Sequence, residues 1–329
     1  MHYTLLGRTG VQVSRLCYGT MSFGGDADEA TSAAMFKRCR DAGINFFDSA
    51  NVYSQGRAEE ILGRLIKGCR DELVITSKVF GQMGKDRNDR GLSRRNIMLA
   101  AEASLQRLGT DRLDVYFCHQ FDPTVPIDET LGAMDDLVRQ GKVLYPGVSN
   151  WSAWQTAKGL GIAERLGLTP IYVLQPMYSL AKRTAEIEIL PLAEQEDLAV
   201  IPYSPLGGGL LTGKYSRSKR DRQGRLVTNE RYSQRYGDDE YYRLAEDFAD
   251  YAKQTGTHAA TLAVAWVMAS PAVTAPIIGA RNVEQLEASL AAADYTMSQE
   301  QWEQMSALTS PVPLATDRAE EKLEKWRGP

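Results

Sequence analysis

Short apolar runs alternate with amphipathic stretches along the chain. The runs are rich in β-branched and aromatic residues and are bounded by turn residues, which is typical of buried strands. They cover residues 16–18, 45–47, 73–76, 113–118, 143–145, 171–174, 198–201 and 274–278. Between them, stretches such as 93–108 carry apolar residues three and four positions apart, as an amphipathic helix does.

The expected helices have recognisable ends. Residues 93–108 begin at Ser93, a good N-cap residue, and stop before Gly109. Residues 128–139 likewise begin on Asp128 and stop before Gly141. Repeated strand–helix units build a parallel sheet, and eight of them close into a barrel. We therefore expect an α/β fold of the (β/α)8 TIM-barrel type.

Further features surround this predicted barrel. Runs 3–6 and 11–14 flank a glycine-bounded turn and predict a β-hairpin before the first barrel strand. Two long loops, 79–91 and 206–239, follow strand ends, where barrel active sites lie. We expect residues 1–329 to form one barrel domain with a charged tail from about residue 310, and the second loop to close over a ligand.

Charge and composition exclude some partners. The 42 acidic and 38 basic residues leave a net charge of −4, which provides no strong field for a nucleic acid or an anionic membrane. Residues 254–280 lack Asp, Glu, Lys and Arg and are long enough to span a bilayer. Pro271 and Pro276 interrupt that stretch, so a buried helix (259–269) and a strand (274–278) are expected instead of membrane insertion.

Several common motifs are missing. The four cysteines form no Cys-x-x-Cys pair and no basic, apolar leader opens the chain, which favours a reducing, cytoplasmic location. Residues 208–214 resemble a phosphate loop, but Tyr215 stands where Ser or Thr is needed. The three histidines are too scattered for a His-rich metal site, so no metal is expected.

Four polar residues lie at or just after consecutive expected strand ends. Asp48 follows the run 45–47, Lys78 follows 73–76, His119 follows 113–118, and Tyr53 lies in the loop after Asp48. Each alone has a simple structural explanation, such as a helix cap or a solvated lysine. In a barrel, however, these ends converge on one mouth, so the set predicts a site.

The four side chains suit carbonyl reduction. A tyrosine is a weak acid, and a nearby ammonium should lower the pKa of its hydroxyl group. A carboxylate would hold that ammonium, and a neutral histidine would orient a carbonyl oxygen. Tyr53 would then donate a proton while a cofactor supplies hydride. A barrel hydrolase or isomerase using Asp48 and His119 is an alternative that would bind no nicotinamide.

The segment 48–53, Asp-Ser-Ala-Asn-Val-Tyr, resembles the Asp-x-Ala-x-x-Tyr motif of the aldo-keto reductase superfamily, and Lys78 and His119 complete its tetrad. Segments 147–151, 175–178 and 202–207 are also similar, and 208–215 is similar to the branch nearer the potassium-channel β subunits and bacterial reductases. The resemblance covers residues 5–308. It implies NADPH-dependent reduction of aldehydes or ketones to alcohols or, alternatively, a cofactor-binding regulatory subunit with little turnover.

The resemblance also implies a cofactor site. At the nicotinamide end, the carboxamide would be held by Ser149, Asn150 and Gln175, and Tyr203 would stack on the ring. The adjoining ribose would be lined by Gly19, Thr20 and Met21, beside Asp48. The pyrophosphate would be approached by Ser204, Leu206, Gly207 and Lys214, and the adenosine end would be formed by Gly279, Arg281 and Gln285. Arg281 favours NADPH over NADH, because a guanidinium fits a phosphate. Ala288 and Ser289 depart from the usual Glu and Asn beside adenine.

The sequence indicates less about the substrate and the oligomeric state. Aromatic residues near expected strand ends predict an apolar pocket for a small carbonyl compound. These residues are Phe23, Phe80, Phe121 and Trp151. The particular substrate, the direction of flux and whether the chain forms a homo-oligomer stay open at this point.

Overall fold

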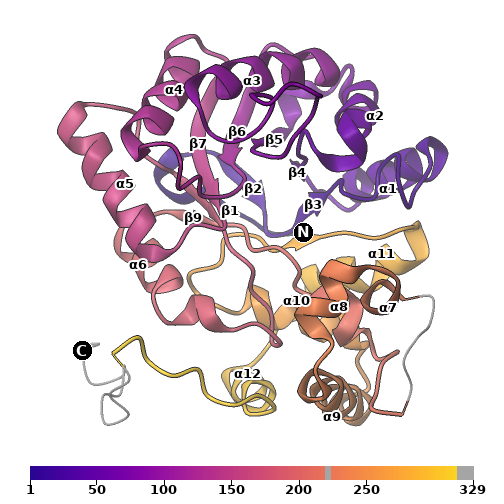
Figure 1. Ribbon diagram of the computed structural model, residues 1–329. Coiled ribbons are helices and arrows are strands. Elements are labelled where there is room, and N and C mark those ends of the chain that lie inside the picture. The colour runs from indigo at the N-terminus through magenta and orange to yellow at the C-terminus, as the bar shows by residue number, and fades with distance from the viewer. Residues whose placement is uncertain (219–223, 317–329) are drawn as a thin grey trace.

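The computed structural model describes residues 1–218 and 224–316, and eight parallel strands lie at its centre (Figure 1). In sequence order they are β3 (Cys17–Gly19), β4 (Phe46–Asp48), β5 (Val74–Val79), β6 (Leu113–Cys118), β7 (Val143–Ser149), β8 (Val173–Gln175), β9 (Ala199–Val200) and β10 (Ile277–Ile278). Their spatial order is β10-β3-β4-β5-β6-β7-β8-β9. Backbone bonds from Thr274 to Val200 and from Ile277 to Pro202 join the two outer strands, which confirms the (β/α)8 barrel.

Helices surround the strands (Figure 1). The α-helices are α1 (Glu29–Asp41), α2 (Arg57–Ile66), α3 (Arg94–Leu108), α4 (Ile127–Arg139), α5 (Ala153–Leu166), α6 (Ile189–Gln195), α7 (Arg225–Thr228), α8 (Glu230–Tyr236), α9 (Asp239–Thr255), α10 (Ala259–Met268), α11 (Val283–Leu290) and α12 (Gln299–Ser306). Short 3-10 helices are η1 (Gly7–Thr9), η2 (Tyr53–Gly56), η3 (Arg70–Glu72), η4 (Thr184–Glu186), η5 (Gly207–Thr212) and η6 (Ala291–Asp294).

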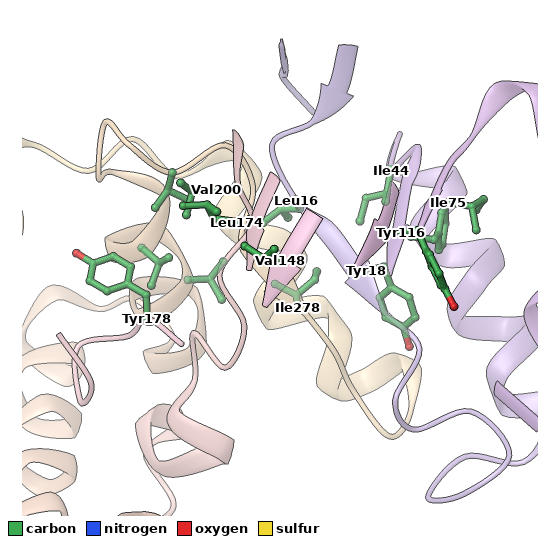
Figure 2. Packing of buried hydrophobic residues seen from close by; sticks show 14 of the residues in the cluster. Leu16, Tyr18, Ile44, Ile75, Tyr116, Val148, Leu174, Tyr178, Val200 and Ile278 are labelled. Atoms are coloured by element: carbon green, nitrogen blue, oxygen red, sulfur yellow. The ribbon is translucent and has the colours of Figure 1, made fainter. Parts of the chain in front are cut away.

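The strands divide the apolar residues between two cores. Successive side chains of a strand point to opposite faces, so Val74 packs inside the barrel and Ile75 packs outside against the helices. The outer core is the larger one, and Figure 2 shows part of it, including Tyr18, Tyr116 and Val200. The same alternation places polar residues at the carboxyl ends of the strands inside the barrel.

An antiparallel hairpin precedes the barrel, as the sequence predicts. It pairs β1 (Tyr3–Leu5) with β2 (Gln12–Ser14). Leu6, just after β1, and Val13, in the middle of β2, are fully buried in the interior core, with the first residues of β3 and β4, Cys17 and Phe46. The hairpin therefore covers the amino-terminal end of the barrel, opposite the end that carries the polar residues.

The helix ends agree with the capping pattern at α3. The Ser93 side chain accepts a hydrogen bond from the Asn96 amide, and Gly109 is left-handed with φ 61°. Helix α4 begins one residue earlier than predicted, at Ile127 after Pro126. Strand β7 continues four residues past the predicted end, and its Gly147 passes close to the Phe117 ring.

The segment 206–239 differs from the predicted loop. It contains η5, α7 and α8, and residues 219–223 lie outside the described part. Asn229 caps α8 by accepting from the Tyr232 amide, and Leu226 and Tyr236 are buried in a separate apolar cluster. These isolated apolar positions do not form a periodic pattern, so the helices were not predicted. Closure of this segment over a ligand stays a prediction.

The predicted loop at 79–91 and the tail from about residue 310 agree more closely with the structure. Residues 80–93 form a loop, in which the Gly91 amide donates to the Phe80 carbonyl oxygen at 2.7 Å. Residues 310–316 of the expected tail have no helix or strand, and the rest of it lies outside the described residues. Within the described residues, no helix is long and apolar enough to cross a membrane.

Gly147 provides a test of the barrel packing. A Cβ atom there would lie 2.5 Å from Cε1 of Phe117, whereas one at Gly161 in α5 meets nothing within 4 Å. Gly147→Ala should therefore lower the free energy of unfolding by about 1–3 kcal/mol through overpacking. Gly161→Ala should raise it by about 0.5–1 kcal/mol through helix propensity. Urea unfolding followed by circular dichroism measures both, and equal stability of Gly147→Ala and the parent chain would contradict this packing.

Candidate active site

Polar side chains gather inside the carboxyl end of the barrel. Asp48 ends β4 and pairs in register with Thr76 of β5, and Ser149 at the end of β7 pairs with Gln175 of β8. Lys78 lies two residues after Thr76, on the same face of β5. The barrel therefore brings together residues that the sequence places far apart.

A buried ion pair lies at the centre of this group. Lys78 Nζ is 2.6 Å from Asp48 Oδ2, and the two side chains are 0% and 2% exposed. The same Nζ donates to the Ser49 carbonyl oxygen at 2.6 Å. Asp48 Oδ1 accepts from Thr76 Oγ1 at 2.7 Å and from Gln175 Nε2 at 2.9 Å. These bonds compensate the loss of hydration that two buried charges suffer.

Thr76 was missed by the sequence reasoning. Its hydroxyl group donates to the catalytic candidate Asp48, yet in the sequence it reads as the last residue of the apolar run 73–76. The sequence contained a signal for this contact, because Thr76 lies two residues before Lys78 and side chains two residues apart in a strand point to the same face of the sheet.

Tyr53 reaches this ion pair from the loop after β4. Lys78 Nζ donates to Tyr53 Oη at 3.2 Å. The chain turns sharply after Tyr53, with Ser54 at φ 48° and Gln55 at φ 56°, a left-handed conformation that is unfavourable for residues other than glycine. The Ser54 hydroxyl donates to the Phe23 carbonyl oxygen at 2.8 Å and so anchors the turn.

Burial and the neighbouring charges have opposing effects on the pKa values of Lys78 and Tyr53. Burial acts to lower the pKa of Lys78, but the Asp48 carboxylate and Tyr53 raise it above its usual value. For Tyr53, burial raises the pKa more than the Lys78 ammonium lowers it, so the net pKa lies above the usual value. The expectation of a lowered Tyr53 pKa is therefore wrong. The lysine stays charged, and the phenol keeps its proton at neutral pH.

His119 lies beside Tyr53, just after β6. The two ring centroids are 6.1 Å apart, with an interplanar angle of 81°. Burial, with the charges of Lys78 and Arg231, lowers the pKa of His119 to about 3. The imidazole is therefore neutral at physiological pH and has one donor and one acceptor nitrogen.

A second hydrogen-bonded group adjoins His119. Asn150, at φ 58°, donates from Nδ2 to the His119 carbonyl oxygen at 2.9 Å and to Ser149 Oγ at 3.0 Å. Its Oδ1 accepts from Tyr203 Oη at 2.7 Å. Ser149 Oγ in turn donates to the Gln175 carbonyl oxygen at 2.9 Å. Four residues expected to hold or face a nicotinamide thus form one network beside the ion pair.

Of the three residues expected to line the ribose, two are buried and one is exposed. Gly19 is buried, and a Cβ atom there would lie 2.7 Å from Ile277 Cγ2. Thr20 is fully buried and donates to Ser49 Oγ at 2.9 Å, so its hydroxyl group already has a partner inside the protein. Met21 is 41% exposed, so of these three residues it is the one that faces solvent.

Glycines shape the expected pyrophosphate segment. Ser204 has φ 61°, and Gly207, at the start of η5, is buried with φ 58°. Leu206 packs against the outer core. Lys214 is exposed and lies beside Gly209, whose Cβ position is 3.7 Å from its Cε. The amides of Gly207 and Gly209 donate to the carbonyl oxygens of Ser204 and Leu206, so the segment forms a tight turn with a lysine beside it.

The expected adenosine end carries a shared carboxylate. Asp26 Oδ2 lies 3.1 Å from Arg281 Nε and 2.8 Å from Arg225 Nη2. Burial acts to raise the pKa of Asp26, but the two arginines outweigh it and lower the pKa. Gln285 Oε1 accepts from the Arg281 amide at 3.3 Å, and Gly279 nearby in the chain is exposed. No sequence pattern pointed to Asp26 or Arg225, because these contacts join residues 199 and 255 positions apart.

The unusual residues of α11 differ in what they face. Ser289 is fully buried, and its hydroxyl group has no hydrogen-bond partner among the described residues. The Ala288 carbonyl oxygen accepts from Thr261 Oγ1 of α10 at 2.6 Å. Ser289 is therefore a buried residue of α11, and the effect of Ala288 and Ser289 on adenine binding stays a prediction.

The expected substrate pocket needs one correction. Phe23 has no exposed surface and packs against Tyr18, with ring centroids 5.8 Å apart, so it is a core residue and lines no open pocket. Trp151 is 5% exposed and contacts Phe121 edge-on at 5.2 Å. Phe80 and Phe121 are half-buried, and their role in a pocket stays a prediction.

The cysteines and other metal-ligating residues add no further site. The four cysteines are free thiols, three of them buried. In residues 1–218 and 224–316, no three His, Cys, Asp or Glu side chains gather as a group that could hold a metal ion.

Comparison with known proteins identifies this chain as an oxidoreductase. The chain belongs to the aldo/keto reductase family, whose sequence model matches residues 15–310. Members of this family generally use a nicotinamide dinucleotide.

Three relatives illustrate the range of this family. The chain is 41% identical to the uncharacterized oxidoreductase YrpG of Bacillus subtilis over 313 residues, which cover 91% of this chain and 93% of that protein. It is 36% identical to a probable voltage-gated potassium channel subunit beta of Oryza sativa over 331 residues (98% and 96%). It is also 36% identical to norsolorinic acid reductase of Aspergillus flavus over 317 residues (91% and 79%).

The low pKa of His119 predicts a pH effect on stability. In the folded chain this pKa is about 3, against an ordinary value of 6.5. Between these values the unfolded chain binds a proton that the folded chain does not, so the free energy of unfolding falls as the pH drops. His119→Asn should reduce the loss of stability between about pH 7.5 and about pH 5 by about 1–2 kcal/mol.

Urea unfolding at the two pH values measures this difference. His2→Asn changes an exposed histidine and serves as the control, which should show the pH dependence of the parent chain. An unchanged pH dependence in His119→Asn would show that His119 is protonated as readily in the folded chain as in the unfolded one.

Proposed function

We propose that this chain reduces aldehydes and ketones to alcohols with NADPH, and that Tyr53 donates the proton. The contact that carries the proposal is the 3.2 Å hydrogen bond between Lys78 Nζ and Tyr53 Oη, backed by the buried Asp48 carboxylate. It places a fixed positive charge against the oxygen of a protonated phenol. That arrangement suits an acid that must lose its proton during the reaction.

Each residue of the tetrad then has a distinct role. NADPH, when bound, supplies the hydride. The neutral His119 donates a hydrogen bond that orients the substrate carbonyl oxygen beside Tyr53 Oη. Tyr53 passes its proton to that oxygen, and the Lys78 ammonium stabilises the phenolate that remains. Asp48 keeps the ammonium charged and in place.

The polar network after β7 and β8 fits a nicotinamide carboxamide. Gln175 uses one Nε2–H on Asp48, which leaves its Oε1 and its second N–H for a ligand. The hydrogen bond from Tyr203 Oη to Asn150 fixes the direction of the tyrosine ring. A ring held in this way supports stacking on one face of the nicotinamide, which would determine the face that gives the hydride.

The charges at the adenosine end support NADPH as the cofactor. Two arginines, Arg225 and Arg281, share the single carboxylate of Asp26, so the group keeps one net positive charge. The guanidinium groups also retain unused donors, which suit the planar fork of a phosphate. We therefore assign this position to the 2′-phosphate. The four free thiols support the prediction of a reducing, cytoplasmic location.

A regulatory role is the second candidate, because one relative is named a probable voltage-gated potassium channel subunit beta. In that case the chain would bind the cofactor tightly and turn over any aldehyde very slowly. Turnover with simple aldehydes separates the two candidates, since both predict NADPH binding.

Replacing Tyr53 by Phe tests the acid assignment. The variant keeps the ring but lacks the proton, so kcat for aldehyde reduction should fall by about 10²–10⁴-fold. The Kd for NADPH, measured by quenching of protein fluorescence, should change by less than about threefold, because Tyr53 is assigned to the substrate and not to the cofactor.

Tyr251→Phe is the matched control. It removes a tyrosine hydroxyl that bonds to Gln304 Oε1 on the outer helices, and it should keep the parent kcat. Normal turnover of Tyr53→Phe would disprove the acid role, whatever the control shows.

Replacing Arg281 by Gln tests the 2′-phosphate assignment. The variant loses a charge that NADPH uses and NADH does not, so the ratio of kcat/KM for NADPH over NADH should fall by about tenfold or more. Steady-state kinetics with each cofactor and one aldehyde measure the ratio. An equal loss with both cofactors would instead point to a structural role, through the Asp26 contact.

A further inference from the structure

Two arginines on α8 have no ligand assigned to them in the site described so far. Arg231 and Arg235 are four residues apart, so they lie on the same face of the helix. Within residues 1–218 and 224–316, neither makes an ion pair with a carboxylate. The acidic neighbour Glu230 accepts a hydrogen bond from Gln234 instead.

Helix α8 is fixed against the mouth of the barrel. The Tyr232 ring lies so close to Gly208 that a Cβ atom there would be 2.5 Å from its Cδ1. Guanidinium groups of Arg225 and Arg235 lie 5.3 Å and 5.7 Å from the same ring. One turn further on, Tyr236 is fully buried, and its Oη lies 3.8 Å from Met177 Sδ, after β8. These contacts hold the helix over the segment that follows Tyr203.

The charges of both arginines reach the reacting groups. After burial and Lys78, Arg231 is the next cause of the low pKa of His119. Burial raises the pKa of Tyr203, and the charges of Arg235 and Arg231 oppose that rise. A charge that affects these two rings also acts on a substrate placed beside them.

The two carboxylates of the site described above are already neutralised. Asp48 is paired with Lys78 beneath the mouth. Asp26 is paired with two arginines at the adenosine end. The mouth therefore offers the guanidinium groups of the exposed Arg231 and the half-buried Arg235, which have no carboxylate partner among the described residues.

We propose that Arg231 and Arg235 form an anion subsite that selects carbonyl substrates carrying a carboxylate or a phosphate group. The carbonyl would lie at Tyr53 and His119, with the anionic group against α8. The proposal rests on the reductase function proposed above, since it describes the same mouth. An alternative source of the anion is the cofactor pyrophosphate, and the experiment below separates the two.

The test compares benzaldehyde with para-carboxybenzaldehyde, which differ only in the charged group. Parent chain and Arg231→Gln/Arg235→Gln are assayed with saturating NADPH. The kcat/KM for para-carboxybenzaldehyde should fall by about tenfold in the double variant, mainly through KM. The kcat/KM for benzaldehyde and the Kd for NADPH should each stay within about twofold. Arg165→Gln, at the exposed far end of α5, is the matched control and should change neither aldehyde.

Two results would overturn the proposal. An increase in the Kd for NADPH with an unchanged preference between the aldehydes would assign the arginines to the cofactor. No change in any of these values would make them ordinary surface residues.

A binding experiment distinguishes failure of the anion subsite from failure of the reductase function. If the parent chain reduces neither aldehyde, binding of para-carboxybenzaldehyde to the NADP+ complex is measured by protein fluorescence. Weaker binding to the double variant, with benzaldehyde binding unchanged, would still support the anion subsite. Equal binding of para-carboxybenzaldehyde to both proteins would reject it.

Discussion

Lys78 must keep a full positive charge in a place that water does not reach, and the centre of the barrel is arranged around that requirement. Removing an ammonium and a carboxylate from water costs several kcal/mol per ion unless good partners replace the water. Asp48, Ser49 and Tyr53 surround the ammonium, while Thr76 and Gln175 hold the carboxylate. Because these partners come from β4, β5 and β8, the ion pair is satisfied only when the barrel has closed.

The same arrangement sets the chemistry of Tyr53. Burial keeps its proton on at neutral pH, while the ammonium 3.2 Å away stabilises the anion that remains once the proton leaves. The phenol thus holds its proton in the resting protein and can release it to an oxygen that gains charge. The left-handed turn at Ser54 and Gln55 is a local cost, of about 1–3 kcal/mol per residue, of placing the hydroxyl group there.

The sequence predicted most of what depends on local pattern. Asp48, Lys78 and His119 could be placed because apolar runs mark the strands and strand ends meet at one mouth. Three features depend on packing between distant segments and were missed: the net rise in the pKa of Tyr53, the helices within 206–239, and the Asp26–Arg281 contact. Burial decides the first of these, and burial is a property of the closed barrel.

The most direct measurement follows NADPH absorbance and alcohol formation together, with the parent chain and a panel of simple aldehydes. If the mouth transfers hydride to a carbonyl that Tyr53 protonates, NADPH binds tightly and equimolar alcohol appears as NADPH is consumed. Tight binding without turnover of any aldehyde would contradict the reductase and favour a cofactor-binding regulatory subunit. No binding of NADPH or NADH would contradict both.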